Sequence, residues 1–136
     1  MKDYNELLGK YINQIKTDNN YIYFITKDNI TIRISKFVPY CCCYVGEYID
    51  EITKDGTCCG VITNIETDIS GNQKEWYNPD REIVYAGNVT FYFENGKIDM
   101  KVKGLDNGYY GVVFTMPVEI LRGKDNEQKH KLYKRI

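Results

Sequence analysis

The most chemically reactive side chains in this sequence are those of five cysteines, all within the stretch Val38–Gly60. They form two clusters, Cys41–Cys43 and Cys58–Cys59. Thiolates bind metal ions and act as nucleophiles, so the spacing must be judged for both uses. Zinc sites favour cysteine pairs separated by roughly two to four residues, and neighbouring side chains of an extended chain point to opposite faces. Three consecutive thiolates are poorly placed for one ion, so we expect no metal and no cofactor, and mainly buried packing roles.

The other reactive side chains do not favour catalysis. A cysteine nucleophile needs a base, usually histidine, within hydrogen-bond reach, but the single histidine, His130, lies in the terminal tail. The number of cysteines is odd, which argues against a disulfide framework. The sequence lacks serine-hydrolase, zinc-protease and phosphate-loop motifs. We interpret the carboxylates between the cysteine clusters as the solvated face of a helix, and we expect a protein that is not an enzyme.

Nucleotide binding is the chemistry that the composition leaves open. The chain has 13 tyrosines and 1 tryptophan, and aromatic rings stack on bases while lysine and arginine hold phosphates. The candidate ligand-binding residues combine cations, aromatic rings and one amide: Arg33, Trp76, Tyr77, Arg81, Lys101, Lys103, Asn107, Tyr109 and Tyr110. Tyrosine is also typical of half-buried strands, so ordinary strand composition is the alternative interpretation.

Alternating apolar and polar residues predict antiparallel strands that position these groups. Lys27-Asp28-Asn29 and Asn95-Gly96 supply turn residues between alternating runs, so each indicates a β-hairpin. The predicted strands are Lys10–Lys16, Tyr21–Thr26, Ile30–Lys36, Cys59–Asp68, Val89–Phe93, Ile98–Val102 and Tyr109–Met116. About seven strands in two meanders therefore flank the cysteine stretch.

Three segments depart from this strand pattern. Between Tyr44 and Lys54 the apolar residues recur at helical spacing, which predicts a short helix after the cysteines. A single helical turn is predicted at Asn5–Lys10, and residues 69–81 are typical of a surface loop. We predict a mainly β fold whose antiparallel meanders form a sandwich or a partly open barrel, with that one short helix. The alternative is a single curved sheet packed by the helix and completed by dimerisation.

Length and charge narrow the class of protein. The 136 residues suit a single domain, residues 1–136, with a basic tail from about residue 122. The net charge of −1 argues against general nucleic-acid binding. No apolar run approaches the roughly 20 residues of a membrane-spanning helix, and the N-terminus lacks the apolar core of a signal peptide. We therefore expect no membrane association and a cytosolic location.

A set of short motifs extends over most of the chain. They are Leu7-Leu8-Gly9-Lys10, the Cys42-Cys43 pair followed by Tyr48-Ile49-Asp50-Glu51-Ile52, and a late Asn107-Gly108-Tyr109-Tyr110. In this order they resemble a family of small phage and prophage proteins catalogued as a domain of unknown function. The resemblance covers Leu7 to about Val118. The family pattern has Asp and Glu on either side of the cysteine pair, where this chain has Cys41 and Tyr44, so no role of those acids is carried over.

The resemblance implies a phage context, in which small non-enzymatic proteins often counter host defences. Some sequester a nucleotide immune signal, commonly as dimers or larger oligomers, and others bind a defence protein directly. We therefore predict a homo-oligomer, a dimer, that binds a cyclic nucleotide or a related signalling nucleotide in the host cytosol. The alternatives are a protein–protein inhibitor of a host defence enzyme and a structural phage module without a ligand.

Overall fold

β-strands make up most of the described chain. The computed structural model describes residues 3–39, 46–70, 83–106, 116–122 and 134–135. Its elements are the 3-10 turn η1 (Tyr4–Leu7) and the strands β1 (Tyr11–Thr17), β2 (Tyr21–Thr26), β3 (Thr31–Ser35), β4 (Phe37–Pro39), β5 (Gly46–Gly56), β6 (Gly60–Ser70), β7 (Ile83–Phe93), β8 (Gly96–Asp106), β9 (Val118–Leu121) and β10 (Lys134–Arg135).

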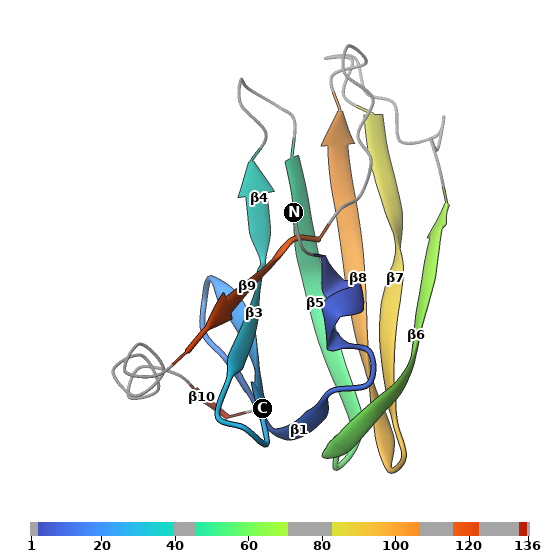
Figure 1. The fold of residues 1–136 in the computed structure, drawn as a ribbon. Helices are drawn as coiled ribbons and strands as arrows, with labels where there is room; N and C mark the ends of the chain where they lie inside the picture. Colours follow the sequence, from blue (N-terminus) through green and yellow to red (C-terminus); the bar gives the residue numbers. More distant parts are fainter. Residues whose placement is uncertain (1–2, 40–45, 71–82, 107–115, 123–133, 136) are drawn as a thin grey trace.

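The strands form one antiparallel sheet that curls on itself (Figure 1). Its order is β4-β5-β8-β7-β6-β1-β2-β3-β9, and β10 pairs with β1. The last strands of this order return towards the first, because β3, the neighbour of β9, is separated in the chain from β4 by Lys36 alone. Beside the β4–β5 pairing, the backbone N–H of Ile49 on β5 donates a hydrogen bond to the carbonyl of Lys36 over 2.8 Å. The sheet is thus curled but not closed, which confirms the predicted mainly β, antiparallel class.

Both predicted hairpins are present. β2 and β3 pair across the turn at residues 27–30, where Asn29 has a positive φ of 60°. β7 and β8 pair along their whole length, from Ile83 opposite Asp106 to Phe93 opposite Gly96. The predicted strand at Cys59–Asp68 corresponds to β6, whereas most of the predicted strand up to Met116 lies outside the described residues.

The predicted helix between Tyr44 and Lys54 is wrong. From Gly46 onward this segment is strand β5, which pairs with β8 as far as Gly56. In the described part of the chain the helical element is η1, and this agrees with the turn predicted near the N-terminus. No helix in that part is long and apolar enough to cross a membrane.

A β-bulge explains why β5 imitates a helix in the sequence. Asp50 is an extra residue in the ladder, since Ile49 pairs with Val102 and the pairing then shifts by one residue. Ile52 pairs with Met100 and packs, like Ile49, against the core. One extra residue between them breaks the period of two, so isoleucines three positions apart share a face.

The same Ile-x-x-Ile pattern with a bulge recurs on two other strands. On β1 the extra residue is Asn13, and on β6 it is Thr63. The flanking isoleucines face the core in both cases: Ile12 and Ile15 on β1, Ile62 and Ile65 on β6. A bulge bends its strand and increases the local twist, so three bulges in one sheet favour a curled shape over a flat one.

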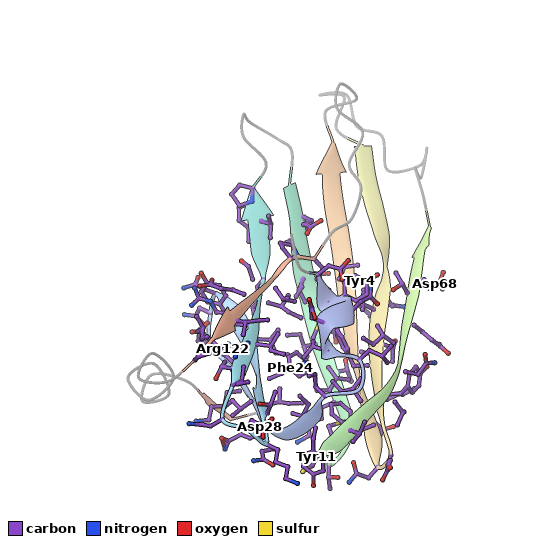
Figure 2. All side chains as sticks on the ribbon, viewed as in Figure 1. Tyr4, Tyr11, Phe24, Asp28, Asp68 and Arg122 are labelled. Atoms are coloured by element: carbon purple, nitrogen blue, oxygen red, sulfur yellow. The ribbon has the colours of Figure 1, made fainter. Side chains whose placement is uncertain are left out.

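The hydrophobic core lies inside the curled sheet. It joins one half of the sheet, which contains β1, β2 and β3, to the other half, which contains β6, β7 and β8. Phe24 on β2 and Phe91 on β7 are fully buried, and their ring centroids are 5.4 Å apart. Tyr4 of η1 meets the same Phe91 ring edge-on, with the ring centroids 6.5 Å apart. Figure 2 labels Tyr4 and Phe24 among the side chains inside the curl. The remaining buried apolar side chains include Leu7, Ile22, Ile32, Ile34, Cys58, Val89, Ile98, Met100, Val102 and Met116. β1, β2 and β3 thus share one hydrophobic cluster with β6, β7 and β8.

Candidate functional site

The structure does not bring the predicted cations together. Arg33 lies on β3, where its guanidinium donates hydrogen bonds to Glu119 of β9 and stacks 4.1 Å from the ring centroid of Tyr21. Burial lowers the pKa of Arg33, but the hydrogen bond and the charge of Glu119 outweigh it, and the net shift is upward. Arg33 is therefore a fixed partner in a β3–β9 ion pair.

The two predicted lysines lie on β8, on the other half of the sheet. The Lys101 ammonium is 3.3 Å from a carboxylate oxygen of Glu51, and that of Lys103 is 3.3 Å from Asp50. Both acids lie on the neighbouring strand β5, so these four side chains form a charged outer face. Exposed ion pairs of this kind contribute little to stability, and their charges already have partners.

The remaining predicted ligand residues lie outside the described residues. They are Trp76, Tyr77, Arg81, Asn107, Tyr109 and Tyr110. The strands that flank them end at one edge of the sheet, since Ile83 pairs with Asp106 and Ser70 pairs with Ala86. The described parts of β6, β7 and β8 therefore end together at this end of the sheet.

Of the cysteines, Cys58 is a core residue. It is 2% exposed, and its thiol donates weak hydrogen bonds to the carbonyls of Asp55 and Lys97. Burial raises the pKa of this thiol, which disfavours the reactive thiolate. Cys59 is half-buried, and Cys41–Cys43 lie outside the described residues. The described chain holds no group of three or more His, Cys, Asp or Glu side chains placed to bind a metal ion.

A cleft that the sequence did not predict lies beside the β2–β3 turn. This basic cleft has a volume of about 220 Å³. It is lined by Gly9, Lys10, Tyr11, Thr26, Lys27, Asp28, Ile30, Ile32, Ile120 and Arg122. Its walls come from the start of β1, the β2–β3 turn, β3 and the end of β9, so residues far apart in the chain meet there.

The local structure fixes two sides of the basic cleft. The backbone N–H of Lys27 donates to the carbonyl of Tyr11 over 2.9 Å, and the Lys27 ammonium lies 5.4 Å from the Tyr11 ring centroid. The buried hydroxyl of Thr26 accepts the N–H of Ile30 over 3.1 Å and shapes the turn. Ile32, 1% exposed, belongs to the core below.

The charge of the basic cleft is unbalanced. Among the described residues its lining has three cations, Lys10, Lys27 and Arg122, against one carboxylate, Asp28, which leaves two positive charges in excess. Within the described residues none of the three cations forms an ion pair, in contrast to the paired cations at Arg33 and on β8. Ammonium and guanidinium groups without carboxylate partners are suited to hold an oxyanion, above all a phosphate.

Comparison with known proteins identifies a family for this chain but no reaction. The chain matches no curated protein and no solved structure. A family match covers residues 5–116, which includes β1 to β8 and leaves β9, with the Arg122 side of the basic cleft, beyond the matched residues. The chain therefore belongs to the family described as a domain of unknown function (DUF7448).

Proposed function

We propose that this protein is a non-enzymatic binding protein that sequesters a signalling nucleotide, and that the basic cleft takes its phosphate. The observation that carries the proposal is the group of three cations around one cleft, Lys10, Lys27 and Arg122, none of which forms an ion pair with another described residue. These side chains are all exposed, so a ligand can reach them without unfolding any element. Charge-assisted hydrogen bonds to phosphate are stronger than neutral ones, and three such cations suit a ligand of two or more negative charges.

The size and lining of the cleft support a nucleotide held partly outside it. Pockets that enclose a whole small molecule usually measure about 300–1,000 Å³, and this cleft has about 220 Å³. It has room for a phosphate and part of a sugar. Tyr11, 44% exposed at its edge, offers a ring on which a base can stack.

The side chains of the cleft favour binding over turnover. Its described lining has no thiol and no imidazole, the groups that most often serve as nucleophile and general base. Sequestration needs affinity alone, and charge and stacking supply it. The phage origin, the anti-defence role, the cytosolic location and the dimeric state belong to this proposal through the resemblance of the motifs.

The proposal is tested by melting temperature in the presence of ligand. Cyclic dinucleotides, cyclic trinucleotides and cyclic ADP-ribose isomers form the panel. A ligand at about 100 times its Kd stabilises the folded state by about 2.7 kcal/mol, which raises the Tm of a chain of this size by on the order of 10 °C. Flat melting curves across the whole panel would show that no such signal is bound.

Matched variants locate the site. Lys27→Gln and Arg122→Gln each remove one unpaired cation, and we expect each to weaken binding by about tenfold. Lys101→Gln removes the same charge from the outer face of β8, where its partner is Glu51, and should leave affinity unchanged. Equal losses in all three variants would mean that net charge, and not the basic cleft, governs binding.

A protein–protein inhibitor is the second candidate, and Phe37 favours it. This side chain is 56% exposed on β4, the strand at one end of the sheet order. Sheet edges with exposed apolar side chains are common sites of strand addition. Capture of a defence enzyme by the native protein, lost in Phe37→Ser, would support this role, whereas capture unchanged by the substitution would argue against the β4 edge.

A further inference from the structure

A second cavity lies between β5 on one side and the end of β1 with the β3–β4 link on the other. This Lys36 slot has a volume of about 380 Å³ and is lined by Thr17, Lys36, Ile49, Asp50, Glu51 and Ile52. Its volume falls within the range of pockets that hold a small molecule. The slot is distinct from the basic cleft, with which it shares no lining residue.

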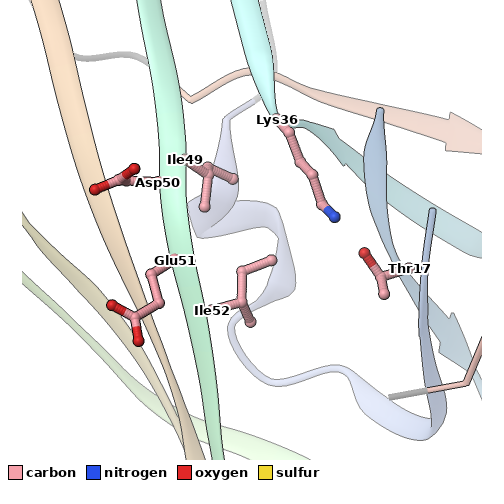
Figure 3. A pocket seen from close by; sticks show the side chains of 6 residues that line it. All are labelled: Thr17, Lys36, Ile49, Asp50, Glu51 and Ile52. Atoms are coloured by element: carbon pink, nitrogen blue, oxygen red, sulfur yellow. The ribbon is translucent and has the colours of Figure 1, made fainter. Parts of the chain in front are cut away.

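The described lining of the slot has an apolar wall, Ile49 and Ile52, opposite a polar wall with the Lys36 ammonium, and two carboxylates, Asp50 and Glu51, complete it. Figure 3 shows the side chains of Ile49 and Ile52 projecting from β5 towards the side where Lys36 and Thr17 lie. The bulge at Asp50 is what places both isoleucines on this face. Asp50 and Glu51 point away from them (Figure 3), towards β8, where they pair with lysines.

Lys36 presents a partly buried ammonium to this space. One of its three N–H donors goes to the carbonyl of Asp18 over 2.6 Å. Burial lowers the pKa of Lys36, and the nearby charge of Asp18 opposes this shift only in part. The Asp18 carboxylate is itself occupied, because it accepts the N–H groups of Asn20 and Tyr21 and the hydroxyl of Tyr23, each over 2.7 Å. The ammonium therefore keeps donors for a further acceptor.

We propose that the Lys36 slot binds a small amphipathic carboxylate, with the carboxylate on the Lys36 ammonium and the apolar body along Ile49 and Ile52. Charge complementarity selects the head group, since a half-buried ammonium is stabilised by an anion that replaces its lost water. Lys36 is the one cation among the described lining residues, and it suits one negative charge and not a polyphosphate. The Thr17 hydroxyl already donates to the carbonyl of Tyr21 over 3.1 Å, so the donors for the carboxylate come from the Lys36 ammonium.

The test uses octanoate, with 1-octanol as the uncharged probe of equal chain length. Saturable 1:1 binding of octanoate is measured by calorimetry and by the carboxyl carbon resonance of 1-13C-octanoate. We expect Lys36→Met, which keeps the apolar stem of the side chain, to weaken octanoate binding by about tenfold or more and to leave octanol binding within about twofold. Lys97→Met, at an exposed lysine of β8 outside the described lining of the slot, is the matched control and should bind octanoate as the native protein does.

Three results would overturn the proposal. They are no octanoate binding to the native protein, octanoate binding unchanged in Lys36→Met, and equal losses in Lys36→Met and Lys97→Met. Circular dichroism and melting temperature check that Lys36→Met is folded. If Lys36→Met does not fold, Ile52→Phe is tested instead, because its larger side chain fills the slot from the β5 wall. This variant should abolish octanoate binding, and unchanged binding in it would also refute the site. Nucleotide binding at the basic cleft is independent of all these outcomes.

Discussion

The contact between Phe24 and Phe91 predicts that the two halves of the sheet fold as one unit. The two rings come from β2 and β7, which do not pair with each other, and their centroids are 5.4 Å apart at a tilt of 52°. Both side chains are 0% exposed. Replacing either ring therefore removes a contact across the core and not merely within one half.

The size of the effect follows from this geometry. Phe→Leu keeps most of the apolar volume, so each single substitution should cost about 1–1.5 kcal/mol of unfolding free energy. An aromatic pair adds about 0.5–1.5 kcal/mol beyond area burial. The double variant, Phe24→Leu with Phe91→Leu, should therefore lose less than the sum of the singles by that amount. Phe91→Ala should cost about 3–5 kcal/mol, a large share of the roughly 5–15 kcal/mol of a typical domain.

Urea denaturation of the native protein, the two single variants and the double variant gives the coupling energy. Phe37→Leu with Phe91→Leu is the control cycle, because Phe37 is exposed and its effect should be additive. Independent sites add to within about 0.3–0.5 kcal/mol. A Phe24–Phe91 coupling below about 0.3 kcal/mol, or two separate unfolding transitions, would refute a shared core.

Three further predictions concern the turns and the buried polar groups. Gly56 has φ +85°, and a Cβ there would collide with the backbone of Asn95 and Gly96 in the neighbouring β7–β8 turn, so Gly56→Ala should cost on the order of 2–4 kcal/mol. Gly9→Ala, at φ +81° with open space around it, should cost only about 1–2 kcal/mol, and equal losses would remove the steric reason. Glu47, 2% exposed, accepts the N–H of Met116 over 2.7 Å, so Glu47→Ala should cost about 1–3 kcal/mol by urea titration, and Glu47→Gln, which keeps an acceptor, less. Asp18 is predicted to make the fold sensitive to acid. Burial raises the pKa of Asp18, but a tyrosine hydroxyl, two backbone N–H groups and a lysine together lower it below 3.8. The unfolded state therefore takes up the proton first as pH falls, so stability from Asp18 is complete well above pH 3.8 and is lost as pH falls through the lower, folded value. Urea midpoints measured from pH 6 to about pH 2 should fall less steeply for Asp18→Asn, and identical slopes would contradict this assignment.

The strands and hairpins could be predicted because their signals are local. The turn at Lys27-Asp28-Asn29 and the Asn95-Gly96 pair determine where the chain reverses, and alternation then determines which face of each strand is buried. The pairing of β1 with β6 joins residues about fifty positions apart, Tyr11 with Val61. No local pattern encodes that contact. The sequence could therefore predict the fold class, but not the strand pairing that curls the sheet.

In the β5 segment the apolar spacing was read correctly, but the helix predicted from it is wrong. Ile49 and Ile52 do lie on one face, as helical spacing requires, but an extra residue in a strand produces the same spacing. Length and composition favour neither reading in so short a segment.

The candidate site could not be found from the sequence, because cations are common and their partners are distant. Arg33 is neutralised by Glu119, 86 positions away, and no periodicity reveals that pairing. The basic cleft joins Lys10, Lys27 and Arg122 from three separate segments. The only sequence signal for it was the start of the basic tail near residue 122.

The bulges also determine where the chain can change length. In a regular strand, losing one residue moves every later side chain to the opposite face. At a bulge the reverse holds: without Asp50, Ile49 and Ile52 would be two positions apart and would still both face the core. We expect a chain lacking Asp50 to fold with a modest loss in urea midpoint, and a chain lacking Thr53, three residues before the end of the strand at Gly56, to lose more; equal losses would contradict this. Asn13 and Thr63 occupy the same position on their strands, so single-residue deletions among relatives should fall at these three points.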